Sequence, residues 1–414
     1  MNITNSKILL AVLLVSVLFA SCDTWHDDNS QSDQYSYYIN IGEFSTLNSV
    51  KNYRIGLPKE LNQKAVIQKI SDRSYRLLVG KYISSYDAGK DAYRFYSNGL
   101  FRNYSIMKNG REVLDEFRNI LFVAYFQGRP SVYELDILSK KIGMIWSRWG
   151  SKVISLNVSE GRQTAFILSA LAFGKRGGLS YITDVRVFLL NREKNEYYEK
   201  SALGDGVQLY TYWENADTFK VNLTSIDSVN SRFIFQNIFP FDLNGKRANI
   251  HKRKFDLITD GFPLPPQRNP IYFSPNSRFQ LRQSTFNNEH DIYLKDLHEK
   301  SEILVASSIR KIADARWSED GNYLFLVTDN TVPSTGKRKA PPSGELIVIN
   351  AVQKKQVNLF SGYRYKNILV HGDFLLFDER SSSTSKINIL NYRQNKTFYT
   401  ISMPGGCGLN NLPM

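Results

Sequence analysis

The feature that most constrains the fold is a succession of short apolar runs that begins at Tyr35 and continues to the end of the chain. Runs of about four to eight residues rich in Tyr, Phe, Ile, Val and Leu alternate with clusters of Gly, Asn, Asp and Ser. No segment shows the long 3.6-residue period of an amphipathic helix. The chain also holds 24 Tyr and 25 Phe among its 414 residues, and these residue types favour strands. The pattern predicts an all-β fold.

Three consecutive units share one plan, which is a polar turn, a strand, a loop and a second strand. Matching turn positions recur at similar distances, since Ser274 and Ser318 are 44 residues apart, and Gly321 and Gly372 are 51 residues apart. Repeats of roughly 40 to 50 residues with several strands are typical of propeller blades. The units comprise residues 271–279 with 291–296, 315–323 with 345–350, and 372–377 with 386–391.

Four further units with a less regular pattern bring the expected number of blades to seven, although the length also permits eight. They comprise residues 75–79 with 92–96, 121–124 with 131–136, 159–161 with 185–191, and 219–223 with 232–235. We therefore predict a single β-propeller domain over residues 35–414. The alternating segment Tyr37–Ile41 is expected to pair into the last blade and close the ring.

One turn of these units resembles a known family. The sequence Trp317-Ser318-Glu319-Asp320-Gly321 is similar to the W-S-P-D-G turn of TolB-like and WD40-like propeller repeats. The match is partial at residues 274–276 and weak at residues 159–161. The resemblance implies a fold and no particular activity.

The N-terminal segment indicates the cellular localisation of the protein. An apolar run from Ile8 to Ala20 follows Lys7 and is too short to span a bilayer, which is typical of a secretory signal peptide; a buried N-terminal helix is the alternative. Residues 18–22 resemble a bacterial lipobox, with Phe19 in place of the usual Leu. We predict a signal peptide over 1–21, acylation of Cys22, and a flexible polar tether over 22–34. These features predict a bacterial envelope lipoprotein, on a membrane and leaflet that the residues do not specify.

The cysteine content limits the class of fold, and the net charge limits the chemical classes of partner that the protein can bind. Two Cys exclude a disulfide framework, and the net charge of +14, or +13 after removal of Lys7, favours acidic protein, glycan or lipid partners. Export argues against nucleic acid. The Pro-rich loop 331–344 carries Lys337, Arg338 and Lys339, which we expect either to contact anionic lipid or glycan or to be a solvated cluster.

The minimal motifs of several enzyme classes are missing from the sequence. It contains no G-x-S-x-G, H-E-x-x-H, G-x-x-x-x-G-K-[ST] or C-x-x-C, so we expect no catalytic, metal or cofactor site of those kinds. Trp146, Trp149 and Trp213 are candidate partner anchors, although blade packing would explain them equally well.

We therefore expect a binding or scaffolding module for a protein or glycan. The alternative is a polysaccharide lyase or hydrolase built on the propeller. Convergence of two or more of five candidates in the channel would favour the enzyme, and dispersed positions would favour the binding module. These candidates are His251, His290, His371, Asp378 and Glu379. His298 is expected in an exposed turn.

Overall fold

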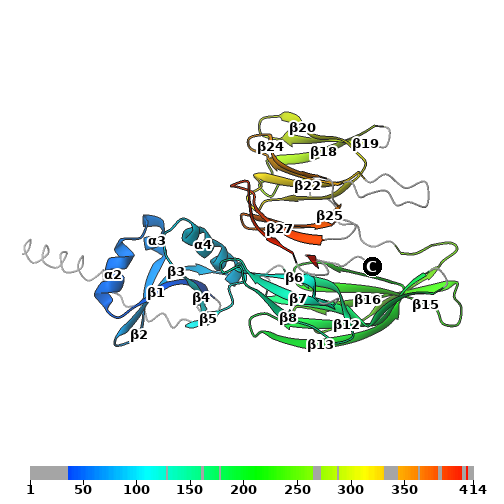
Figure 1. Ribbon diagram of the computed structural model, residues 1–414, viewed down its shortest axis with the longest axis horizontal. Coiled ribbons are helices and arrows are strands. Elements are labelled where there is room, and N and C mark those ends of the chain that lie inside the picture. The colour runs from blue at the N-terminus through cyan, green and yellow to red at the C-terminus, as the bar shows by residue number, and fades with distance from the viewer. Residues whose placement is uncertain are drawn as a thin grey trace, which may run out of the picture. The chain divides into compact units, whose positions relative to one another are not determined.

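The computed structural model describes residues 36–126, 129–159, 163–176, 179–263, 272–286, 289–330, 344–361, 364–380, 385–402 and 407–408 (Figure 1). The described residues divide into two compact units, of which unit 1 comprises those within 36–84 and 103–112 and unit 2 those within 85–102 and 113–408. Within the described segments, no helix has both the length and the apolar character needed to cross a membrane.

Unit 1 is a mixed unit with one five-stranded sheet. The strand order is β2 (Ala65–Ser71), β3 (Ser74–Tyr82), β1 (Tyr37–Phe44), β4 (Ser105–Lys108) and β5 (Arg111–Val113), and helices α2 (Leu47–Ile55) and α3 (Lys59–Lys64) connect β1 to β2. Alternate residues of β1 are buried, and the Thr46 side chain caps α2 by accepting a hydrogen bond from the Ser49 N–H at 3.1 Å.

The structure of the two units corrects three sequence predictions. Strand β1 pairs with β3 and β4, so Tyr37–Ile41 does not enter the last blade, and the expected single domain over 35–414 is divided. Residues 92–96, expected as a strand, belong to helix α4 (Ser85–Ser97) in unit 2. The buried positions Ser85, Ala88, Ala92 and Phe95 recur every three or four residues, which is a helical period that the aromatic content obscured.

The described residues of unit 2 form six antiparallel sheets, and the unit is a β-propeller. The first sheet has the order β29 (Cys407–Gly408), β6 (Asn119–Phe126), β7 (Arg129–Asp136) and β8 (Ile142–Trp146). A strand from the C-terminal end of the chain therefore completes the first blade. The second sheet consists of β9 (Lys152–Val158), β10 (Thr164–Ala170), β11 (Ala172–Arg176), β12 (Leu179–Asn191) and β13 (Glu196–Gly206).

The remaining four sheets are meanders of consecutive strands. The third is β14 (Gln208–Trp213), β15 (Thr218–Ile226), β16 (Phe233–Asp242) and β17 (His251–Asp256), and the fourth is β18 (Phe279–Phe286), β19 (Glu289–Asp296) and β20 (Ser301–Ile309). The fifth is β21 (Ile312–Trp317), β22 (Tyr323–Asp329), β23 (Gly344–Asn350) and β24 (Lys355–Ser361). The sixth is β25 (Arg364–His371), β26 (Phe374–Arg380), β27 (Ser385–Asn391) and β28 (Lys396–Ile401).

A local turn repeats once in each of these six sheets. An Asp or Asn ends one strand, and its side-chain oxygen accepts a backbone N–H two or three residues later at 2.9–3.2 Å. A residue with positive φ follows three or four positions after it, as at Lys140 and Asn195. The six residues are Asp136, Asn191, Asp242, Asp296, Asn350 and Asn391. The all-β and β-propeller predictions are confirmed, whereas the count of seven blades is not.

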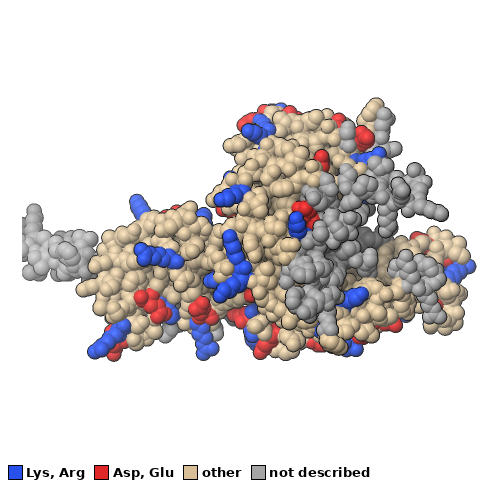
Figure 2. All heavy atoms as spheres, viewed as in Figure 1, with Lys and Arg blue, Asp and Glu red and all other residues tan. Residues whose placement is uncertain are grey.

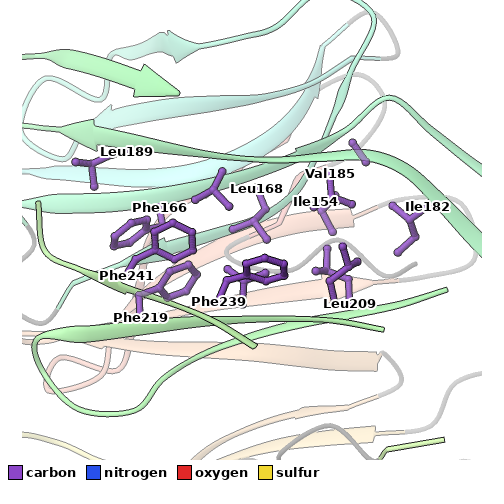
Figure 3. Packing of buried hydrophobic residues seen from close by; sticks show 14 residues of the cluster. Ile154, Phe166, Leu168, Ile182, Val185, Leu189, Leu209, Phe219, Phe239 and Phe241 are labelled. Carbon is purple, nitrogen blue, oxygen red and sulfur yellow. The ribbon is translucent and has the colours of Figure 1, made fainter. Parts of the chain in front are cut away.

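Hydrophobic clusters join neighbouring sheets. Between the second and third sheets, Phe166 stacks on Phe219 with ring centroids 4.5 Å apart, and Phe241 packs beside both rings (Figure 3). Similar clusters join the first sheet to the second and to the sixth, the sixth to the fifth, and the fifth to the fourth. These aromatic and branched residues are the apolar runs of the sequence, so burial between blades explains why the pattern recurs.

Candidate functional site

The three candidate tryptophans have different environments. Trp146 is buried and packs against Phe188 at 5.1 Å, and Trp213 packs against Phe166 at 5.8 Å, so packing between blades accounts for both. Trp149 is 79% exposed. Cys22, Lys337, Arg338 and Lys339 lie outside the described residues, and their predicted roles stay predictions.

The turn between β8 and β9 holds Trp149 in place. The half-buried guanidinium of its neighbour Arg148 lies 3.7 Å from the Asp184 carboxylate and 5.7 Å from the centre of the Phe188 ring. The Arg148 carbonyl accepts a hydrogen bond from the Ser151 hydroxyl at 3.3 Å. These contacts fix the turn to the second sheet, so Trp149 is presented from a restrained backbone.

Two further exposed apolar side chains belong to the neighbouring strand edge. Lys152 pairs with Ala170 in the β9–β10 register, and a Cβ added at Gly150 would lie 3.9 Å from Leu171, so the turn runs alongside Leu171. Leu171 is 52% exposed, and Phe173, with the Lys152 ammonium 5.8 Å from its ring centre, is 39% exposed. We define Trp149, Leu171 and Phe173 as the Trp149 patch. Exposed apolar side chains gathered around one turn are typical of interaction surfaces.

The five candidate catalytic residues are dispersed. His251 is exposed on β17, His290 lies on β19 with its Nδ1 2.8 Å from Gln283 Nε2, and the other three belong to the sixth sheet. His371 pairs with Phe374 in the β25–β26 register, and Asp378 is four residues further along β26. At about 3.3 Å per residue, the backbone positions of His371 and Asp378 are therefore separated by about 13 Å along the strand. Asp378 and Glu379 are adjacent in β26, so their side chains leave opposite faces.

Structural contacts explain His371. It is fully buried, its Nε2–H donates to the Phe117 carbonyl at 2.7 Å, and its ring stacks on Phe117 at 4.6 Å. His298 is in an exposed turn, as expected. In the described part of the chain, no group of three or more His, Cys, Asp or Glu side chains could hold a metal ion. The arrangement that would have favoured the enzyme is therefore not observed.

The sequence did not indicate a charged cleft of about 380 Å³ between α4 and three turns of the fifth and sixth sheets. Lys90 on α4 bonds Glu319 at 2.6 Å, and Arg393 bridges the carboxylates of Asp320, at 2.9 Å, and Asp373. Tyr392 donates its hydroxyl hydrogen to the Gly372 carbonyl at 2.7 Å. Oppositely charged groups in the cleft are thus paired with each other.

The pKa shifts in the cleft keep these groups in their usual charge states. Burial raises the pKa of Asp320, but hydrogen bonds from Ser318, Asn322 and Arg393 outweigh it and hold the pKa at about 2. Burial raises the pKa of Tyr392 and of Tyr93, so both phenols stay protonated. A general acid or base needs a pKa near the working pH, so these three shifts favour a structural or recognition role over proton transfer.

Only some of the residues that line the cleft lie in a motif that is recognisable in the sequence. Glu319 and Asp320 lie in the turn that resembles the TolB-like motif, and in the sequence this turn indicates only a fold. Nothing local marks Lys90 or Arg393, which are 303 residues apart. On the face shown in Figure 2, Lys and Arg side chains are interspersed with Asp and Glu. The excess of basic residues is therefore not gathered into one field on that face.

No protein-family model and no curated protein sequence matches the chain. Solved structures with a similar fold include TolB from Acinetobacter baumannii, at 12% identity over 84% of this chain and 80% of that chain, with a TM-score of 0.41. A putative 6-phosphogluconolactonase from Bacteroides uniformis has 13% identity over 70% and 98%, with a TM-score of 0.35. The oligogalacturonate lyase of Vibrio parahaemolyticus has 11% identity over 66% and 86%, with a TM-score of 0.34. Similarities this distant assign no activity to the chain.

Proposed function

We propose that this protein is a binding module of the bacterial cell envelope, anchored through an acylated Cys22, and that its propeller holds a partner protein at the Trp149 patch. The observation that carries the proposal is the exposure of Trp149 on a turn that Arg148 and Ser151 restrain. The repeated sheets supply a rigid support, and the turns between them supply the contacts.

Burial of the Trp149 side chain in a complex would contribute a large binding free energy. A Trp side chain buries about 200 Å², so covering the four-fifths of Trp149 that is exposed stabilises a complex by about 4 kcal/mol at about 25 cal/mol per Å². Because the turn is already held, little conformational entropy is lost on binding. Trp149 therefore has the properties of an interface hot spot.

The composition of the patch favours a protein over a glycan. A sugar stacks on an aromatic ring and needs polar side chains around it for its hydroxyl groups. Leu171 has neither an aromatic ring nor a polar group. A Trp, a Leu and a Phe together are instead typical of the apolar centre of a protein interface.

Site-specific photo-crosslinking in cells tests the binding role. A photoreactive phenylalanine analogue replaces Leu171, which is 52% exposed, or Leu304 on β20, which is 53% exposed and serves as the matched control. We expect a discrete adduct from position 171 alone. Trp149→Ala should abolish the adduct, and Phe286→Ala, which removes another aromatic side chain that is 78% exposed, should preserve it. Adducts that are equal at both positions, or that persist in Trp149→Ala, would contradict the proposal.

The anchor has its own test. Metabolic labelling with a fatty acid should mark the wild-type protein and leave Cys22→Ala unlabelled, and the variant should leave the membrane fraction. Labelling of both proteins would contradict acylation at Cys22 without bearing on the patch.

The enzyme alternative makes a separate prediction. A lyase acting on an acidic polysaccharide releases unsaturated products that absorb ultraviolet light. We expect no such product from purified protein and polygalacturonate, and its appearance would favour the enzyme over the binding module.

A further inference from the structure

Strand β17 differs from the other outer strands of unit 2 in its charge. Its sequence is His251-Lys252-Arg253-Lys254-Phe255-Asp256, and its first four residues are exposed. It lies at the edge of the sheet order β14-β15-β16-β17 and pairs only with β16 in that sheet. The alternate N–H and C=O groups of an edge strand point away from its neighbour and can pair with another strand.

Carboxylates do not neutralise these cations. Lys252 Nζ lies 3.9 Å from the centre of the Phe235 ring, and Lys254 Nζ lies 3.8 Å from that of Phe233. Of the ion pairs between described residues, none includes Lys252, Arg253 or Lys254. The acidic residue of the strand, Asp256, is paired with Arg232. The exposed strand therefore keeps three uncompensated positive charges.

The spacing of these charges matches that of an added strand. Lys252 and Lys254 are two residues apart, so their side chains leave the same face of β17 about 7 Å apart, and Arg253 leaves the other face. An extended peptide beside β17 presents its own alternate side chains at the same spacing. Acidic residues at every second position would then lie across from both lysines, and such cross-strand pairs are stabilising.

We propose that the edge of β17 binds an extended acidic segment of a partner protein by adding it as a further strand. Main-chain hydrogen bonds would supply affinity, and the alternation of carboxylates opposite Lys252 and Lys254 would supply specificity. This surface is separate from the Trp149 patch and does not depend on it, since the two are on different sheets. An experiment that contradicts the proposal for one surface therefore does not contradict the proposal for the other.

The test is fluorescence anisotropy of the full chain with a labelled, blocked peptide in which Glu and Val alternate over eight residues. At about 0.05 M salt, where screening is weak, we expect saturable binding that Lys252→Glu/Lys254→Glu weakens at least about tenfold. The matched control is Lys355→Glu/Lys396→Glu, which reverses two exposed lysines on the outer strands β24 and β28 and should bind like the wild type.

Two further peptides separate strand addition from simple charge attraction. A peptide of the same composition with its Glu residues in one block, and a peptide with alternate backbone amides methylated, should each bind at least about tenfold more weakly to the wild-type protein. These two arms need no variant, so misfolding cannot explain their result. Equal binding of all three peptides would overturn the proposal.

Vesicles test the competing source of negative charge. If phosphatidylglycerol vesicles bind the wild-type protein and not the Lys252→Glu/Lys254→Glu variant while the alternating peptide binds neither, the edge recognises lipid and the proposal is wrong. If the variant aggregates and the wild type binds no peptide, the lysines only protect an exposed edge, and the proposal is equally wrong.

Discussion

The ion pair between Asp136 and Arg118 allows a quantitative prediction of how acid affects stability. Arg118 Nε and Nη2 donate to the two carboxylate oxygens at 2.7 and 2.6 Å, and the N–H groups of Leu138 and Ser139 donate to Oδ1. Burial alone would raise the pKa of Asp136, but these bonds outweigh it and lower the pKa from 3.8 to about 2. The ionised carboxylate is therefore favoured in the folded state.

The sign and size of the effect follow from this difference. A carboxyl with a lower pKa in the folded protein adds stability above its unfolded pKa and loses it as the pH falls toward the folded pKa. At about 1.4 kcal/mol per pKa unit, Asp136 contributes about 2 kcal/mol at pH 7 and about 1 kcal/mol at pH 3. Asp136→Asn retains an oxygen for the turn and removes the charge, so it isolates this contribution.

The assay is urea unfolding at both pH values, followed by far-ultraviolet circular dichroism. Asp136→Asn should lower the free energy of unfolding by about 2 kcal/mol at pH 7 and by about half as much at pH 3. The control is Asp227→Asn, since Asp227 accepts the Val229 N–H at 2.9 Å in a similar turn and has no Lys or Arg partner among the described ion pairs. A loss for Asp136→Asn that is the same at both pH values, or an equal loss for Asp227→Asn, would refute the reasoning.

Thermal melts followed by circular dichroism check the remaining predictions. Phe374→Ala should destabilise the protein by about 3–5 kcal/mol because the ring is fully buried among Tyr93, Phe117 and Phe398. Tyr392→Phe should cost about 1 kcal/mol by removing a hydrogen bond inside the propeller. Trp149→Ala should change stability by less than about 0.5 kcal/mol, since its side chain is largely in solvent; a large loss there would mean that it supports the fold.

The propeller could be predicted because its information is local and repeated. Each blade needs apolar strands that pack on both faces and a polar turn that ends them, and both leave short-range patterns in the sequence. In the third sheet, the predicted segments 219–223 and 232–235 fall on the paired strands β15 and β16, and the turn at Asp242, which matches those at Asp136 and Asp296, is a further local signal. Blade counting therefore needs the turn signature as well as the apolar runs.

Unit 1 was not predictable from the same pattern. Strand β1 alternates buried and partly exposed residues and β3 holds a short buried apolar run, so Tyr37–Ile41 and residues 75–79 are locally indistinguishable from blade segments. What distinguishes them is pairing across more than sixty residues, as between Tyr37 and Lys108. Strand pairing of that range is a tertiary property that leaves no signal at either position.

The candidate surfaces also depend on tertiary structure, which the sequence alone does not reveal. The exposure of Trp149 could not be separated from the burial of Trp146, three residues away, because neither residue type nor spacing fixes which of them enters the core. In the sequence, the cations of β17 are only a short basic run, Lys252-Arg253-Lys254. Their importance depends on their place at the edge of a sheet, and the sheet order supplies that place.

Asp320 shows how the scaffold uses its own charges. Its carboxylate accepts hydrogen bonds from the Ser318 hydroxyl at 2.5 Å and the Asn322 N–H at 3.1 Å within one turn, and from Arg393 of the next sheet at 2.9 Å. One residue thus ends a hairpin and joins two blades, and changing it would disturb both. Trp149, by contrast, is 79% exposed, and Lys252 and Lys254 are exposed on an edge strand. Substitutions at these exposed positions should therefore cost the propeller less stability than a change of Asp320.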